Sequence, residues 1–218
     1  MKRERDWERI MDALAKGLGG GEPTGVSGAT PNREPFKVLV STVISLRTKD
    51  EVTSHASRRL FGRADTPESL SKMKEEEIRQ LIYPAGFYRT KARNLREIAR
   101  ILVFRYAGKV PREMDELLSL PGVGRKTANL VRNMGYDLPG ICVDTHVHRI
   151  SNRLGWVSTR NPHETETALE KILPERYWIG INGLLVRFGQ RVCTPLSPHC
   201  SLCPLAGQCP RIKVGRAR

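Results

Sequence analysis

Apolar side chains recur at helical spacing along most of this chain. In the first segment they predict an amphipathic helix from Trp7 to Leu18. Similar stripes predict further helices over 51–60, 67–81, 92–106, 113–118, 125–134, 143–154, 164–173 and 177–188. The stretch 36–46 is nearly all apolar, which suits a buried strand or a buried helix. Because almost nothing else resembles a strand, we expect a helix there and an all-α fold.

Two breaks in this pattern divide the chain. Residues 17–32 are dense in Gly, Pro, Ser and Thr and indicate a flexible connector, since such residues bury little surface. Residues 135–140 form a second break. The two breaks bracket a central block and so indicate two lobes, but the pattern leaves open whether the ends of the chain pack together.

Charge changes the picture more than overall composition does. The 218 residues carry a formal net charge of +14, which favours a polyanionic partner, nucleic acid first. A basic protein that is merely soluble is the alternative. No apolar stretch approaches the roughly 18 residues of a membrane span, and the first 16 residues lack a signal core. We therefore expect no membrane partner and a cytoplasmic location, associated with the nucleoid in a prokaryote.

A glycine turn between two predicted helices is the first candidate for chemistry. It reads Leu-Pro-Gly-Val-Gly-Arg-Lys-Thr-Ala over residues 120–128. Gly122 and Gly124 allow a tight turn that can lie against a surface, with Val123 between them. The helix that begins near Arg125 would then point N–H groups outward at a phosphate. A plain helix–helix turn is the alternative.

Lys126 and Asp144 are candidate catalytic groups. Lys126 lies in the first turn of its helix, where the helix dipole, helped by burial, favours the neutral amine that forms Schiff bases. A salt bridge to a phosphate, or simple exposure, is the alternative. Asp144 stands where another helix begins, so it can cap that helix and also stabilise positive charge on a reacting sugar or move a proton. His146 and His148 face different directions and are expected to be structural.

Four of the five cysteines crowd into a short C-terminal segment. Cys193, Cys200, Cys203 and Cys209 follow a C-x6-C-x2-C-x5-C pattern with prolines between them. An odd total and this crowding favour ligands in a reducing compartment over disulfides. The spacing suits zinc and a [4Fe–4S] cluster about equally. Cys142 stands apart and is expected to be an ordinary buried thiol.

Taken together, these motifs resemble the endonuclease III group of helix-hairpin-helix DNA glycosylases. The resemblance covers residues 36–209 and rests on the glycine turn, on Val-Asp-Thr-His-Val-His-Arg at 143–149 and on the cysteine pattern. The segments Gly-Phe-Tyr-Arg-Thr-Lys-Ala at 86–92 and Ile-Asn-Gly-Leu-Leu-Val-Arg-Phe-Gly-Gln at 181–190 are also similar to that family.

The resemblance implies a two-lobed all-α structure with a DNA cleft between the lobes. A helical-barrel domain with the hairpin would span 33–135. Residues 1–32 and 136–218 would form a second, discontinuous domain that holds a [4Fe–4S] cluster on the four cysteines. The family pattern, not the spacing, favours iron–sulfur over zinc. Damaged double-stranded DNA is the implied partner of a monomer.

The resemblance also implies a base-excision-repair glycosylase with abasic-site lyase activity. Lys126 would attack C1′ of the sugar and form an imine, Asp144 would stabilise the cationic sugar, and β-elimination would cut the strand. Oxidised pyrimidines of the thymine glycol type would be the substrates. The alternatives are a monofunctional mismatch glycosylase and a non-enzymatic iron–sulfur module that binds DNA.

Two further positions follow from the resemblance. Phe87 stands where members of the family insert a wedge into the base stack, although a core position suits it equally. Arg47 stands at a position where many members carry glutamine. In the family, the residue at this position helps to fill the space left by the flipped base. This departure affects the expected opposite-strand preference and the expected range of lesions, and not the lysine chemistry.

Overall fold

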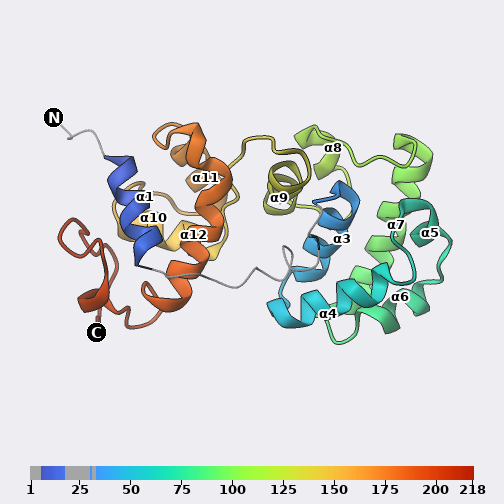
Figure 1. Cartoon of the computed structure of the whole chain (residues 1–218), viewed down its shortest axis with the longest axis horizontal. Coiled ribbons are helices and arrows are strands. Elements are labelled where there is room, and N and C mark those ends of the chain that lie inside the picture. The colour runs from blue at the N-terminus through green and yellow to red at the C-terminus, as the bar shows by residue number, and fades with distance from the viewer. Residues whose placement is uncertain (1–5, 18–29, 31–32) are drawn as a thin grey trace. The chain divides into compact units, whose positions relative to one another are not determined.

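A computed structural model of the chain describes residues 6–17, 30 and 33–218 (Figure 1). Every regular element in this part of the chain is a helix, so the predicted all-α class is confirmed. Contacts divide the chain into a terminal unit, Met1–Glu22 with Pro139–Arg218, and a central unit, Pro23–Leu138. Most of the predicted connector at 17–32 lies outside the described residues. No helix among those described combines the length and apolarity needed to cross a membrane.

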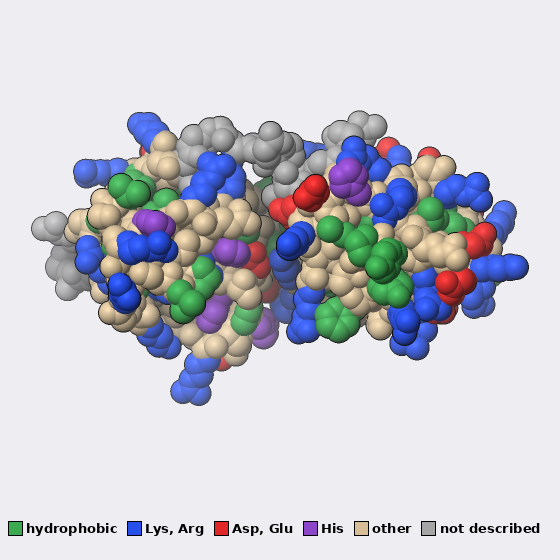
Figure 2. Space-filling view, turned by 90° about the horizontal axis from the view of Figure 1, so that it is seen from below, with side chains coloured by type: hydrophobic (Ala, Val, Ile, Leu, Met, Phe, Trp, Pro, Cys, Tyr) green, Lys and Arg blue, Asp and Glu red, His purple; other side chains and the backbone are tan. Residues whose placement is uncertain are grey.

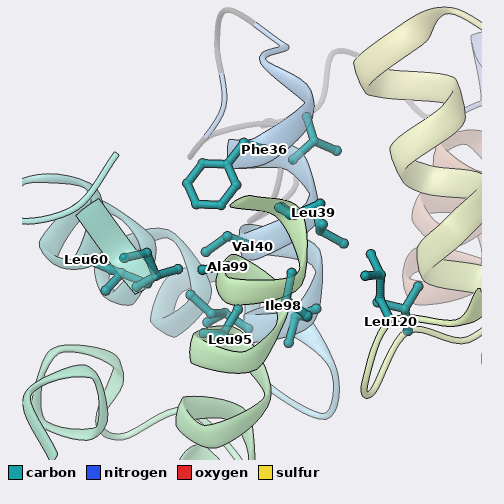
Figure 3. Packing of buried hydrophobic residues seen from close by; sticks show 14 of the residues in the cluster. Phe36, Leu39, Val40, Leu60, Leu95, Ile98, Ala99 and Leu120 are labelled. Carbon is teal, nitrogen blue, oxygen red and sulfur yellow. The ribbon is translucent and has the colours of Figure 1, made fainter. Parts of the chain in front are cut away.

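The central unit is built around α3 (Pro35–Ser45), the apolar helix expected from the sequence. Its core residues face α4, α7 and α9 (Figure 3). Gly135 of α9 allows α9 to approach α3 closely, because a Cβ there would lie 3.0 Å from the Cα of Pro35. The other helices are α4 (Asp50–Phe61), α5 (Pro67–Lys72), α6 (Glu75–Ile82), α7 (Tyr88–Tyr106), α8 (Met114–Leu118) and α9 (Arg125–Tyr136).

The predicted single helix over 67–81 is wrong, because two helices occupy this segment. Met73 has an extended backbone that ends α5, and Lys74 is the N-cap of α6. The Glu77 side chain accepts a hydrogen bond of 2.8 Å from the backbone N–H of Lys74, and acidic residues fill the first turn of α6. This capping outweighs the continuous apolar stripe, because it satisfies N–H groups that a helix start leaves exposed.

Two predicted boundaries also shift. α7 begins at Tyr88, four residues before the expected start at 92, so five of the seven residues of the 86–92 motif are helical. The expected break at 135 comes too early, since α9 continues to Tyr136. Gly135 serves helix packing against Pro35 and does not end the helix.

The terminal unit joins the two ends of the chain. Trp7 of the first helix packs edge-on against Trp156, with ring centroids 5.1 Å apart. Both tryptophans belong to a core that also includes Phe188 and Leu205. The helical elements of this unit are α1 (Trp7–Lys16), α10 (Thr145–Arg153), α11 (Pro162–Glu170), η1 (Glu175–Tyr177), α12 (Trp178–Arg191) and η2 (Cys200–Leu202).

Positive charge is spread over the surface of both units. Figure 2 shows Lys and Arg side chains across the visible face, with fewer Asp and Glu among them. The excess agrees with the net charge of +14. Each unit therefore presents cations that attract a polyanion.

Candidate functional site

The glycine turn joins α8 to α9 in the central unit. Gly122 adopts a left-handed backbone with a φ of 76°, and the N–H of Val123 donates to the carbonyl of Leu120 at 3.1 Å. Val123 is buried and anchors the turn, while both glycines are exposed. A Cβ on Gly122 would lie 2.5 Å from the side-chain nitrogen of Asn94 on α7. The turn is thus packed against the central unit on the side of Val123 and Asn94, and its two glycines are exposed to solvent.

Neither the backbone conformation nor the packing of the chain requires a glycine at position 124, unlike position 122. The φ of Gly124, −103°, suits any residue, and a Cβ there would meet no atom of the chain within 4 Å. Gly124 is the N-cap of α9 and offers no side chain to cap it, and the first turn of α9 contains no acidic residue. The N-terminal amides of α9 therefore form a positive surface that a phosphate can approach closely.

Lys126 is the second residue of α9 and is exposed, with the half-buried Arg125 before it. Lys126 does not have the burial that the sequence led us to expect, because its side chain is exposed. The expected place in the first helical turn is confirmed. The positive end of the α9 dipole acts on Lys126 at that place.

Asp144 belongs to the terminal unit, where it is the half-buried N-cap of α10. Its Oδ1 accepts hydrogen bonds from the backbone N–H groups of His146 at 2.8 Å and Val147 at 2.9 Å. Two such bonds fix the orientation of the carboxylate. His148 contacts Thr165 at 2.7 Å, and His146 contacts Arg149 at 3.2 Å, in keeping with structural roles for both histidines.

Arg47 and Phe87 come together on the central unit, although 40 positions separate them in the chain. The Arg47 guanidinium lies 5.4 Å from the centroid of the Phe87 ring. Phe87 is 63% exposed, so it is not a core residue. Both residues adopt left-handed backbones, with φ values of 52° and 58°. This conformation is costly for residues with a side chain and persists only where neighbouring structure enforces it.

All four C-terminal cysteines line one cavity of the terminal unit. Leu154, Phe188 and Val192 supply apolar walls of that cavity. Among the described residues, no three His, Cys, Asp or Glu side chains are placed to hold a single metal ion. Four thiols around one cavity are a donor set that suits either zinc or an iron–sulfur cluster.

Arg153 on α10 organises the loop that carries these cysteines. The buried guanidinium donates to the carbonyls of Thr194 at 2.7 Å and Pro195 at 2.6 Å, and to the Cys193 sulfur at 3.5 Å. Burial raises the pKa of the Cys203 and Cys209 thiols. Burial thus favours the protonated thiols, and a metal held by these two residues would displace their protons on binding.

Comparisons with known proteins identify the family. Residues 40–175 match the HhH-GPD superfamily of base-excision DNA repair proteins, and residues 193–209 match the iron–sulfur binding domain of endonuclease III. Endonuclease III of Thermotoga maritima is 56% identical over 176 residues, which cover 81% of this chain and 83% of that protein. This chain belongs to the endonuclease III family.

Other members of the endonuclease III family extend the comparison. The chloroplastic endonuclease III homologue 2 of Arabidopsis thaliana is 45% identical over 94% of this chain, which spans 58% of that protein. A solved non-covalent endonuclease III–DNA complex superimposes with a TM-score of 0.85 at 36% identity, covering 97% of each chain. A trapped covalent endonuclease III–DNA intermediate gives a TM-score of 0.79 at 34% identity, over 95% of this chain and 97% of the other.

Membership of the endonuclease III family decides between the two metals that the spacing left open. The cofactor is a [4Fe–4S] cluster, held by Cys193, Cys200, Cys203 and Cys209 in our assignment. The cavity that these cysteines line fits this donor set. Cys142 is fully buried, as expected for an ordinary thiol.

Sequence reasoning missed Lys91, the most deeply buried lysine of the described residues. It is 5% exposed, and burial lowers the pKa of its ammonium to about 8. A lysine on the apolar stripe of α7, between Tyr88 and Ala92, was the available signal, because a cation at such a position requires buried acceptors. The Lys91 Nζ donates to protein oxygens of the α3–α4 segment.

Proposed function

We propose that this chain is a bifunctional DNA glycosylase and abasic-site lyase that removes oxidised pyrimidines from duplex DNA. Its relatives are named endonuclease III, and a DNA complex and a trapped covalent DNA intermediate of similar proteins support a covalent step on DNA. The observation that carries the proposal is that Lys126 is exposed in the first turn of α9, two residues after Gly124, where the space beside the backbone is open.

In the proposed reaction the damaged base first leaves the stack, because the enzyme cannot reach C1′ within the duplex. The Lys126 Nζ attacks C1′, the C1′–N bond to the base breaks, and the base departs with that electron pair and a proton. Ring opening then gives an imine between Lys126 and C1′. Loss of a proton from C2′ expels the 3′ phosphate, which cuts the strand by β-elimination.

Asp144 acts on the same sugar in this proposal. Its carboxylate stabilises the positive charge that develops at C1′ and accepts a proton from the attacking lysine. The two backbone hydrogen bonds on Oδ1 support such a role, because they fix the carboxylate before substrate binds. Gly122, Gly124 and the α9 amides, with Arg125, would hold the phosphate backbone.

Lys91 is the rival nucleophile, since burial lowers the pKa of its ammonium to about 8 and so favours the neutral amine. Its geometry argues against that role. The side chain is buried, and its nitrogen is engaged by three oxygens of the protein. An attacking amine must instead reach a sugar, and Lys126 is exposed to do so.

Borohydride trapping on abasic-site DNA tests the proposal. Wild type should form a covalent adduct, and Lys126→Ala should form none, because the variant lacks the amine. Lys126→Arg is the matched control, since it keeps the charge for a phosphate and loses the nucleophile. It should bind DNA within a few-fold of wild type and give no adduct. Equal adduct from wild type and both variants would refute the role of Lys126.

Substrate range needs a separate measurement on a panel of duplexes. We expect release of thymine glycol and dihydrouracil with strand nicking, and little action on uracil or mismatched adenine. Base release without nicking would favour the monofunctional alternative. Binding without any product would favour a non-enzymatic module.

A further inference from the structure

Lys91 places a cation where two loops of the central unit meet. The side chain comes from the first turn of α7 and is 5% exposed. Its ammonium donates to the carbonyls of Ile44 at 2.7 Å and Leu46 at 2.5 Å, and to the Thr48 hydroxyl at 2.9 Å. An ammonium has three N–H donors, so these three acceptors use its whole capacity. None of the described salt bridges involves Lys91.

Thr48 extends this network to the segment that precedes α7. Its Oγ1 accepts from the backbone N–H of Gly86 at 3.1 Å as well as from Lys91, and donates to the carbonyl of Leu46 at 3.3 Å. A Cβ on Gly86 would lie 2.3 Å from the carbonyl oxygen of Arg47. The two backbones therefore touch at Gly86 and Arg47, with Thr48 and Lys91 joining them.

Arg47 and Phe87 lie directly on this joint. Arg47 is flanked by Leu46 and Thr48, whose oxygens bind Lys91, and Phe87 follows Gly86. Both have left-handed backbones and exposed side chains that contact each other. A left-handed residue relaxes unless its neighbours prevent it, so the joint is what holds this pair in place.

We propose that Lys91 and Thr48 are positioning residues, which hold Arg47 and Phe87 as one preformed unit that enters the DNA base stack. The inference rests on the proposed function, and it adds what orients the two side chains that the family resemblance expects to fill the base stack. Preorganisation matters here because a displacement of about 1 Å in a positioned side chain removes much of the rate acceleration that correct orientation provides. A helix C-cap for α3 alone would need only an exposed cation and would not engage Thr48 or Gly86.

The test compares duplex and single-stranded DNA that carry the same abasic site. Only the duplex has a base stack to fill. Lys91→Met removes the donors at similar length, and Thr48→Val removes the hydroxyl at similar shape. Both variants should slow borohydride trapping on the duplex on the order of tenfold and stay within about twofold of wild type on the single strand. Thr48→Ser is the matched control, since it keeps the hydroxyl and should behave as wild type on both.

A second readout does not depend on the lyase step. With 2-aminopurine opposite the abasic site, entry of Arg47 and Phe87 should unstack the probe and raise its fluorescence. Lys91→Met and Thr48→Val should lose most of that rise. Thermal unfolding and the visible absorbance of the cluster check that each variant is folded, and Thr48→Val serves if Lys91→Met fails to fold.

The outcomes separate the two proposals. Equal slowing on both DNA forms, or no slowing on either with an unchanged fluorescence rise, would overturn the positioning role. No adduct from wild type on either DNA would contradict the proposed function, and the fluorescence readout would still decide the positioning role.

Discussion

At the scale of single residues, the two glycines of the α8–α9 turn have different tasks. Gly122 has a φ of 76°, so Gly122→Ala should lower the free energy of unfolding by about 1–2 kcal/mol. Gly124 meets no strain or contact, so Gly124→Ala should cost less than about 1 kcal/mol. A methyl group there should nevertheless weaken duplex binding, because it keeps phosphates away from the α9 amides.

Chemical denaturation and a binding titration on the two alanine variants check this prediction. Each variant is the control for the other. Unchanged DNA affinity in Gly124→Ala, with a stable fold, would show that no phosphate approaches this turn closely.

Asp144 combines a cap with a charge, and two substitutions separate them. Asparagine also caps helices well, so Asp144→Asn should keep stability within about 0.5 kcal/mol, whereas Asp144→Ala should lose about 1 kcal/mol. Both should lower the rate of base release on the order of a hundredfold, because both remove the negative charge. Single-turnover kinetics and thermal unfolding give the two readouts, and a normal rate in Asp144→Asn would limit Asp144 to capping.

At the scale of elements, Lys91 links α7 to the end of α3 and predicts a dependence of stability on pH. The pKa of Lys91 is about 8 in the folded chain and about 10.4 in an unfolded one, so between these values the unfolded chain binds more protons. The free energy of unfolding of the protein should therefore rise as pH increases from 8 to 10, and Lys91 should contribute at most about 3 kcal/mol to this rise. Below pH 7, Lys91 should make no pH-dependent contribution.

The pH prediction is checked by denaturant titrations of wild type and Lys91→Met at pH 7 and pH 10. Other titrating groups cancel in the difference between the two proteins. The free energy of unfolding of wild type should increase relative to that of Lys91→Met between pH 7 and pH 10. A difference between the two proteins that does not vary with pH would contradict the effect of burial on Lys91.

The spacing of apolar residues predicted where most helices lie but not every helix boundary. The apolar stripe located α7, and the apolar run at 36–46 located α3, because burial against neighbours needs such faces. The apolar stripe over 67–81 gave no sign of the division into α5 and α6. The division depends on a local hydrogen bond between Lys74 and Glu77, which the spacing of apolar residues does not reveal.

At the scale of the whole molecule, the charge of +14 predicts binding that weakens steeply with salt. If several phosphates are neutralised, log K for undamaged duplex should fall with log salt by about 0.9 per phosphate. Fluorescence anisotropy at several salt concentrations measures this slope. Lys126→Ala should reduce the slope by about one if Lys126 also contacts a phosphate, and a flat dependence would contradict backbone binding.

The sequence alone determined the class of fold, the glycine turn, the lysine in its following helix, the aspartate cap and the four cysteines, since each depends on residues near one another in the chain. The choice of iron–sulfur over zinc came from family resemblance. Tertiary structure decided what depends on residues far apart. It placed α1 against Trp156 and brought Arg47 to Phe87. It also buried Lys91 among oxygens more than 40 positions away. Hydrophobic spacing cannot reveal such contacts, because two of the three acceptors of Lys91 are backbone carbonyls, which every residue carries.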